Sequence, residues 1–210
     1  MNRLTCLFIR HGKTQGNIEK RYIGQKTDET LCEEGIRDLR AESKTLICGA
    51  LSTERLRRAY VSPMRRCIQT AQIILPDYEY IYVDDFREID FGSFENKNYI
   101  ELADNSDYQE WIASGGSMPF PNGEARADFV DRNIRAFREI MQSESVNSGD
   151  RTVPFVLHGG SIMAIMSELT GEDYYSFQLQ CGEILKIELK LDGAKIDVIS
   201  YDRVCYRSDT

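Results

Sequence analysis

The sequence has few of the features that mark membrane, secreted or metal-binding proteins. Its longest apolar stretch near the start, Leu4 to Ile9, is followed at once by Arg10 and is far too short for a signal core or a spanning helix. Six cysteines are scattered without a CxxC pair, which favours buried thiols in a reducing compartment over a zinc site or a disulfide framework. We therefore expect a cytoplasmic protein with no membrane partner.

Basic residues are also fewer than acidic residues. The 34 Asp and Glu residues outnumber the 26 Lys and Arg residues, which gives a formal net charge of −8 at pH 7. A broad basic face for a phosphate backbone is not expected, so we predict no nucleic-acid partner. With 210 residues, 41% of them hydrophobic, the chain can bury a substantial core without disulfide or metal support. We predict a single domain over residues 1–210.

Short apolar runs alternate with helical patterns along the chain. The expected strands span residues 4–9, 59–62, 80–83 and 153–157. The expected helices span residues 33–47, 65–75, 125–141 and 161–169. Because the apolar runs are short and continuous, as central parallel strands are, the pattern predicts an α/β fold: a three-layer sandwich whose mostly parallel central sheet is flanked by helices. A hairpin signal at Asp192-Gly193 adds antiparallel strands at 184–191 and 196–201.

Two local features modify this outline. Thr30 and Glu33 match a capping box, which predicts that Thr30 caps the helix that follows. The polar segment from Glu95 to Glu124, with two adjacent glycines and two prolines, breaks the alternation of strands and helices. Long insertions of this kind are often lids, and we predict a lid insertion at about 95–124.

Chemically useful side chains follow the predicted strands. The only two histidines, His11 and His158, each stand at a strand end and before a glycine. The other such side chains are Arg10, Arg65, Arg66 and Glu88. In an open α/β sheet ligands bind beyond the carboxyl ends of the strands, so these groups are expected to converge. The alternative is that these residues have only structural roles: each histidine is an isolated core or surface residue, and Glu88 forms a surface ion pair with Arg87.

This set suits a phosphoryl group better than other ligands. Arginine and imidazole hold the oxygens of a tetrahedral phosphoryl group and neutralise its charge. The same arginines would repel a divalent cation, and no GxSxG nucleophile elbow occurs. The glycine after each histidine lets backbone amides approach an anion, and a helix that opens near Gly159 would add a favourable N-terminus. We predict a phosphate pocket with no metal and no cofactor.

Four sequence blocks carry a resemblance to a known family. They are Arg10-His11-Gly12-Lys13-Thr14-Gln15-Gly16-Asn17, Ser62-Pro63-Met64-Arg65-Arg66-Cys67-Ile68-Gln69-Thr70-Ala71, Arg87-Glu88-Ile89-Asp90-Phe91-Gly92-Ser93-Phe94-Glu95 and His158-Gly159-Gly160. With these blocks in this order, the chain resembles the histidine phosphatase superfamily, the phosphoglycerate mutase-like enzymes. The segments 21–24 and 121–124, together with Asp28, resemble its α-ribazole phosphatase branch.

The resemblance implies a metal-independent phosphomonoester hydrolase that works through a phosphohistidine. It implies that His11 is the nucleophile and that Glu88 protonates the leaving oxygen and then activates water. The groups implied to complete the phosphoryl cradle are Arg10, Arg66 and His158. Phosphate contacts are also expected from Asn17, Ile23, Gly24 and Gly159. Arg65 is expected to be a solvated neighbour.

Three functions remain open at this point. The segment 95–124 has six acidic residues against Lys97, a net charge of −5, which we expect to repel bisphosphoglycerate and so to favour a phosphatase over a phosphoglycerate mutase. A binding module for phosphorylated ligands without turnover is the third reading. The partner is expected to be a small phosphoester, with α-ribazole 5′-phosphate one candidate; a homodimer stays open. Tyr108, Trp111 and Phe120 are expected either to stack on a planar leaving group or to form the lid's own small core.

Overall fold

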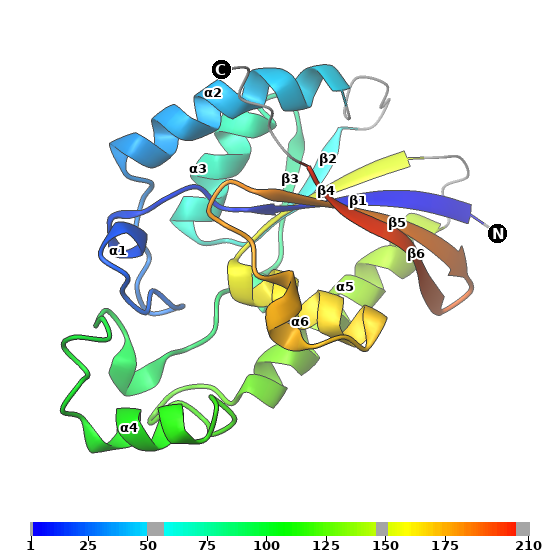
Figure 1. Ribbon diagram of the computed structural model, residues 1–210. Coiled ribbons are helices and arrows are strands. Elements are labelled where there is room, and N and C mark those ends of the chain that lie inside the picture. Colours follow the sequence, from blue (N-terminus) through cyan, green and yellow to red (C-terminus); the bar gives the residue numbers. More distant parts are fainter. Residues whose placement is uncertain (1, 50–56, 146–150, 205–210) are drawn as a thin grey trace.

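A six-stranded sheet is the middle layer of the computed structural model, which describes residues 2–49, 57–145 and 151–204 (Figure 1). The strand order is β3-β2-β4-β1-β5-β6. The strands are β1 (Asn2–Arg10), β2 (Arg58–Val61), β3 (Glu79–Tyr82), β4 (Arg151–Leu157), β5 (Ile184–Asp192) and β6 (Lys195–Val204). The first four pair in parallel, whereas β5 is antiparallel to both β1 and β6. Of these six strands β5 therefore runs against the other five, which confirms the mostly parallel sheet.

Helices cover both faces of the sheet because its central strands are apolar on both sides. They are α2 (Glu33–Gly49), α3 (Arg65–Ile74), α5 (Arg126–Ser145) and α6 (Gly159–Thr170). In β1, Leu7 and Ile9 join a core cluster with residues of α2 and α3, whereas Cys6 and Phe8 join a second cluster with residues of α5 and α6. Figure 1 shows the resulting three layers, as the sequence predicted.

The predicted elements are present with shifted ends. Each of the four predicted central strands lies within two residues of its observed bounds. The hairpin of β5 and β6 turns at Gly193, whose φ of 61° suits glycine, and α6 ends at Gly171 with a φ of 74°. The prediction that Thr30 caps α2 is wrong, because the Gly35 N–H donates to Cys32 Sγ at 3.4 Å and so places the cap at Cys32.

The lid segment, residues 95–124, contains an unpredicted helix, α4 (Ser106–Ala113). It begins after Asn105, whose side chain accepts the Tyr108 N–H at 2.9 Å. Tyr108 and Phe120 are buried in a third hydrophobic cluster, whose other fully buried members include Phe94 and Phe129. Of the two interpretations of the lid aromatics, Tyr108 therefore follows the lid-core one, whereas stacking of Trp111 or Phe120 on a leaving group stays a prediction. In Figure 1 α4 lies away from the sheet, on the side of α5 and α6.

Four shorter elements lie between these strands and helices. A four-residue helix, α1 (Gln15–Ile18), follows the first histidine and was not predicted. Single 3-10 turns occupy Asp84–Phe86, Gly92–Phe94 and Tyr174–Phe177. Among the described helices, none combines the length and the apolar character that crossing a membrane requires.

Candidate active site

The two histidines meet because their strands are neighbours. Arg10 and Leu157, the last residues of β1 and β4, are register partners, so His11 and His158 leave the sheet side by side. Their ring centroids are 5.2 Å apart, and the two side chains are almost completely buried. The convergence predicted from the strand ends is confirmed.

The hydrogen bond of His11 determines which ring nitrogen carries the proton. Its Nδ1 lies 2.7 Å from the Gly12 carbonyl oxygen, which can only accept, so Nδ1 is the protonated nitrogen. Burial lowers the pKa of His11 well below its ordinary value, and the charges of Arg66 and Arg10 lower it further. His11 is therefore a neutral imidazole with a lone pair on Nε2, the form that a nucleophile requires.

His158 is held between an arginine and a serine. The Arg66 Nε donates to His158 Nδ1 at 3.3 Å, so Nε2 carries the proton and donates to Ser62 Oγ at 2.8 Å. Burial, followed by the charge of Arg66, lowers the pKa of His158 well below its ordinary value. In this arrangement His158 orients Arg66, and its direct contact with a phosphoryl group stays a prediction. The sequence assigned no role to Ser62.

Two guanidinium groups lie at the site without a carboxylate partner. Arg66 is almost fully buried and donates to the carbonyl oxygens of Thr27, Ile23 and Gly24 at 3.0, 3.3 and 3.4 Å. Arg10 donates through Nη1 to the Leu179 carbonyl, while its Nε is buried without a hydrogen-bond partner. Within residues 2–49, 57–145 and 151–204 neither arginine forms an ion pair. Uncompensated buried cations are costly, so the arrangement is suited to an anion.

The predicted phosphate-contact residues differ in what they do. The carbonyls of Ile23 and Gly24 hold Arg66, and the Gly24 N–H donates to Glu95 Oε1 at 2.9 Å. Asn17 Oδ1 accepts the Thr14 N–H at 3.1 Å and so caps α1. Contact of these three residues with a phosphate stays a prediction. The hydrogen bonds that the structure describes for them are made to other protein groups, which they hold in place.

Gly159 is placed where a larger residue would press on an arginine. It is the first residue of α6, and a Cβ there would lie 3.2 Å from Arg10 Cζ. Thr70 gives further support, since its hydroxyl accepts the Gly12 N–H at 3.0 Å and donates to the Arg66 carbonyl at 2.7 Å. Arg65, in contrast, is exposed, as predicted.

Glu88 is a buried carboxyl group on the α6 side of the site. Its Oε1 accepts the Ile89 N–H at 3.0 Å, and a Cβ on Gly160 would lie 2.4 Å from the same oxygen. Burial raises the pKa of Glu88 above its ordinary value, although nearby N–H groups and arginines oppose the shift. The surface alternative is wrong, because Glu88 is only 8% exposed and Arg87 pairs with Asp84 at 3.1 Å. Glu88 is suited to donate a proton.

Comparison with known proteins agrees with this geometry. The sequence profile of the histidine phosphatase superfamily (branch 1) matches residues 6–202. The chain belongs to the histidine phosphatase superfamily. A 2,3-bisphosphoglycerate-dependent phosphoglycerate mutase of Bartonella quintana is 30% identical over 189 residues, which cover 85% of this chain and 88% of the relative.

Solved structures of histidine phosphatases share the fold. A phosphoserine phosphatase of Entamoeba histolytica, solved as a mutant in complex with phosphoserine, superposes with a TM-score of 0.74 at 25% identity, covering 94% of this chain and 96% of that one. An α-ribazole phosphatase of Shigella flexneri has a TM-score of 0.73 at 20% identity, covering 92% and 94%. The phosphoglycerate mutase-like fold expected from the four sequence blocks is confirmed.

A cavity of about 290 Å³ adjoins this histidine phosphatase site. It is lined by Arg10, Tyr22, Glu88, Ile89, Phe91, Trp111, Gly116, Phe120, Arg126, Gly159, Gly160, Met163, Tyr174, Tyr175 and Gln178. His11 and Arg66 do not line it, whereas Glu88, Arg10 and Gly159 do, so the cavity adjoins the Glu88 side of the site. We name it the leaving-group cavity, after the role proposed for it below.

The acidic residues of the lid do not line this cavity. Glu101 instead pairs with Arg21 at 2.7 Å, and Glu124 pairs with Arg132 at 2.7 Å. The expectation that the net charge of the lid repels bisphosphoglycerate stays a prediction, because charges act over about 8–10 Å and need not line the cavity.

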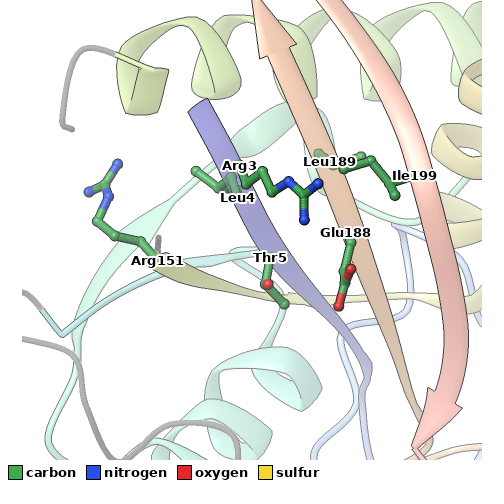
Figure 2. A pocket seen from close by; sticks show the side chains of 7 residues that line it. All are labelled: Arg3, Leu4, Thr5, Arg151, Glu188, Leu189 and Ile199. Atoms are coloured by element: carbon green, nitrogen blue, oxygen red, sulfur yellow. The ribbon is translucent and has the colours of Figure 1, made fainter. Parts of the chain in front are cut away.

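A second cavity, of about 180 Å³, lies far from these groups. Figure 2 shows its lining side chains on β1, β4, β5 and β6: Arg3, Leu4, Thr5, Arg151, Glu188, Leu189 and Ile199. It is next to the first residues of β1, the opposite end of that strand from His11. In the part of the chain that the structure describes, no group of three His, Cys, Asp or Glu side chains could hold a metal ion.

Proposed function

We propose that this protein is a phosphomonoester hydrolase that passes the phosphoryl group of a small metabolite to His11 Nε2 and then to water, without metal or cofactor. One observation carries the proposal: a neutral, buried His11 with an unprotonated Nε2 lies beside two guanidinium groups that lack a carboxylate partner. Such cations stabilise the charge that spreads over phosphoryl oxygens during transfer.

The reaction has two steps. In the first, His11 Nε2 bonds to phosphorus, the ester P–O bond breaks, and Glu88 gives its proton to the leaving oxygen. In the second, water attacks phosphorus, the P–N bond breaks, and the Glu88 carboxylate takes the proton from water. Arg10 and Arg66 hold the phosphoryl oxygens throughout. Burial raises the pKa of Glu88, which favours the acid form that the first step requires.

Hydrolysis is favoured over mutase transfer by the similarity to a phosphatase solved with phosphoserine. Phosphoglycerate mutase-type transfer is the second candidate, since a mutase is 30% identical to this chain. The two differ in their product from 3-phosphoglycerate. The hydrolase releases inorganic phosphate and glycerate, whereas the mutase forms 2-phosphoglycerate.

A labelling experiment tests the proposal. After rapid quenching of a reaction with a ³²P-labelled phosphoester in EDTA, we expect an acid-labile, base-stable label on His11. The variant His11→Ala should take no label, and Arg65→Gln, which changes the exposed neighbour of Arg66, should label normally. Vanadate should block turnover. Label on serine, cysteine or aspartate, or a requirement for a divalent ion, would refute the mechanism; phosphate binding without label would indicate a binding module.

A further inference from the structure

Arg126 is a cation on the wall of the leaving-group cavity without an anionic partner. It is the first residue of α5 and is partly buried. Its guanidinium carbon lies 5.6 Å from the ring centroid of Tyr174, a cation–π contact. Across the residues that the structure describes, it makes neither an ion pair nor a hydrogen bond.

Neighbouring arginines differ from Arg126 in this respect. Arg132, less than two turns along α5, forks onto both oxygens of Glu124 at 2.7 and 2.9 Å. Arg135 pairs with Asp85 at 3.1 Å. The position of Arg126 also opposes the helix dipole, which favours acidic and not basic side chains in a first turn. A basic side chain in the first turn of a helix, without an anionic partner to offset the unfavourable dipole, is expected at a functional site.

Tyr174 connects Arg126 to the proposed proton donor. The Tyr174 hydroxyl donates to the Gly160 carbonyl at 3.3 Å, and Gly160 packs directly against the Glu88 carboxyl group. The charge of Glu88 also contributes to the raised pKa of Tyr174, although burial is the larger cause. Glu88, Tyr174 and Arg126 therefore line the same cavity, with Tyr174 in contact with Arg126 and with the glycine beside Glu88.

The cavity favours a small leaving group that carries negative charge. Of its three charged lining residues, Arg10 and Arg126 are cationic and Glu88 alone is a carboxyl group. A volume of about 290 Å³ is at the lower end of the range for ligand pockets, which suits a few-carbon group better than a nucleoside. A guanidinium group binds a carboxylate through two parallel hydrogen bonds.

We propose that Arg126 binds a carboxylate of the leaving group, so that the substrates are phosphate monoesters of small hydroxy acids. This inference rests on the proposed function, since it names the substrate class of the same site. No acidic residue of the lid lines this cavity, so none opposes the carboxylate by direct contact.

Matched substrate pairs test the inference. The pairs are 3-phosphoglycerate with glycerol 3-phosphate and O-phosphoserine with phosphoethanolamine; in each, only the first compound has a carboxylate. The wild-type protein should have a higher kcat/KM for the first of each pair. Arg126→Gln should lower kcat/KM for the carboxylate compounds about 10- to 100-fold, the worth of hydrogen bonds to a charged group. It should leave glycerol 3-phosphate and p-nitrophenyl phosphate within about twofold.

Two control variants separate charge from structure. Arg126→Lys keeps the positive charge but not the two parallel N–H donors. It should therefore recover part of the carboxylate preference that Arg126→Gln loses. Arg138→Gln, which changes an exposed arginine of the same helix, should leave kcat/KM unchanged for every substrate. A loss in Arg126→Gln that is equal for both members of each pair would show a structural role and overturn the inference.

Other outcomes are equally decisive. α-Ribazole 5′-phosphate as the best substrate, unaffected by Arg126→Gln, would refute the carboxylate assignment. A loss confined to bisphosphorylated sugars without a carboxylate would assign Arg126 to a second phosphate instead. Failure of the proposed function is distinguishable, because p-nitrophenyl phosphate has no carboxylate: absence of its hydrolysis by the wild-type protein would refute the hydrolase itself.

Discussion

Gly160 packs against Glu88, the proposed proton donor, which makes Gly160→Ala an informative substitution. A Cβ at this position would lie 2.4 Å from Glu88 Oε1, whereas ordinary contact begins at 3.4 Å. The new methyl group cannot turn away, because Phe129 Cζ lies 3.2 Å from the same point. The Glu88 carboxyl group must therefore move by about 1 Å from the place where it meets the leaving oxygen.

The expected loss of activity follows from this displacement. A misplacement of about 1 Å costs on the order of 10²-fold in rate, or about 2.7 kcal/mol of transition-state stabilisation. The fold should tolerate the change, because overpacking costs about 1–3 kcal/mol while alanine gains about 1 kcal/mol over glycine within a helix. The melting temperature should therefore change little while catalysis falls.

The assay compares two leaving groups in the phosphorylation step. An alkyl phosphate such as glycerol 3-phosphate needs a proton on its leaving oxygen and should lose about 10²-fold in Gly160→Ala. In single-turnover measurements p-nitrophenyl phosphate, whose leaving group departs as a stable anion, should lose much less. The control is Ser161→Ala in the same turn, which removes a buried hydroxyl without a partner and adds no atom. Equal losses for both substrates, or full alkyl phosphatase activity in Gly160→Ala, would refute the reasoning.

Two further predictions concern pH and anion binding. For an alkyl phosphate, wild-type kcat/KM should fall as the pH rises through the raised pKa of Glu88, because only the protonated acid can donate. The variant Glu88→Gln should lose this fall at high pH and react about 10²–10⁴-fold more slowly. A fall at high pH that persists in this variant would assign it to another group. Vanadate at 100 times its Kd should stabilise the folded protein by about 2.7 kcal/mol, which raises its Tm by roughly 5–10 °C. Most of this rise in Tm should be lost in Arg66→Met but kept in Arg65→Met. An equal rise in both variants would show that the anion binds elsewhere.

Most of the parallel strands and the convergence of the two histidines could be predicted because both depend on local sequence. β1, β2 and β4 are largely buried on both faces and read as continuous apolar runs, and the two histidines directly follow β1 and β4. The edge strand β3 is partly exposed along its whole length. Helix α4 could not be predicted, because Tyr108 is its one fully buried side chain and its apolar periodicity is weak.

The supporting residues were missed for a different reason: their partners are remote in the sequence. Glu95 accepts the N–H of Gly24, 71 residues earlier, and so fixes the loop whose carbonyl oxygens hold Arg66. Ser62 meets His158 across 96 residues. No local pattern distinguishes such a serine or glutamate from a solvated one. The net charge of the lid follows from the sequence, but a charge count gives no direction for any of its acidic side chains.

The place of β4 in the sheet governs when the protein can become active during its synthesis. β4 lies between β1 and β2, so the two earlier parallel strands have no mutual pairing and are joined only through a strand made from residues 151–157. A nascent chain that ends before β4 already contains Arg10, His11, Arg66 and Glu88, yet nothing aligns them. Such pairings between distant segments form slowly, since a long loop must close first. Until residues 151–157 have been synthesised, the growing chain therefore cannot bring the groups of the candidate site together.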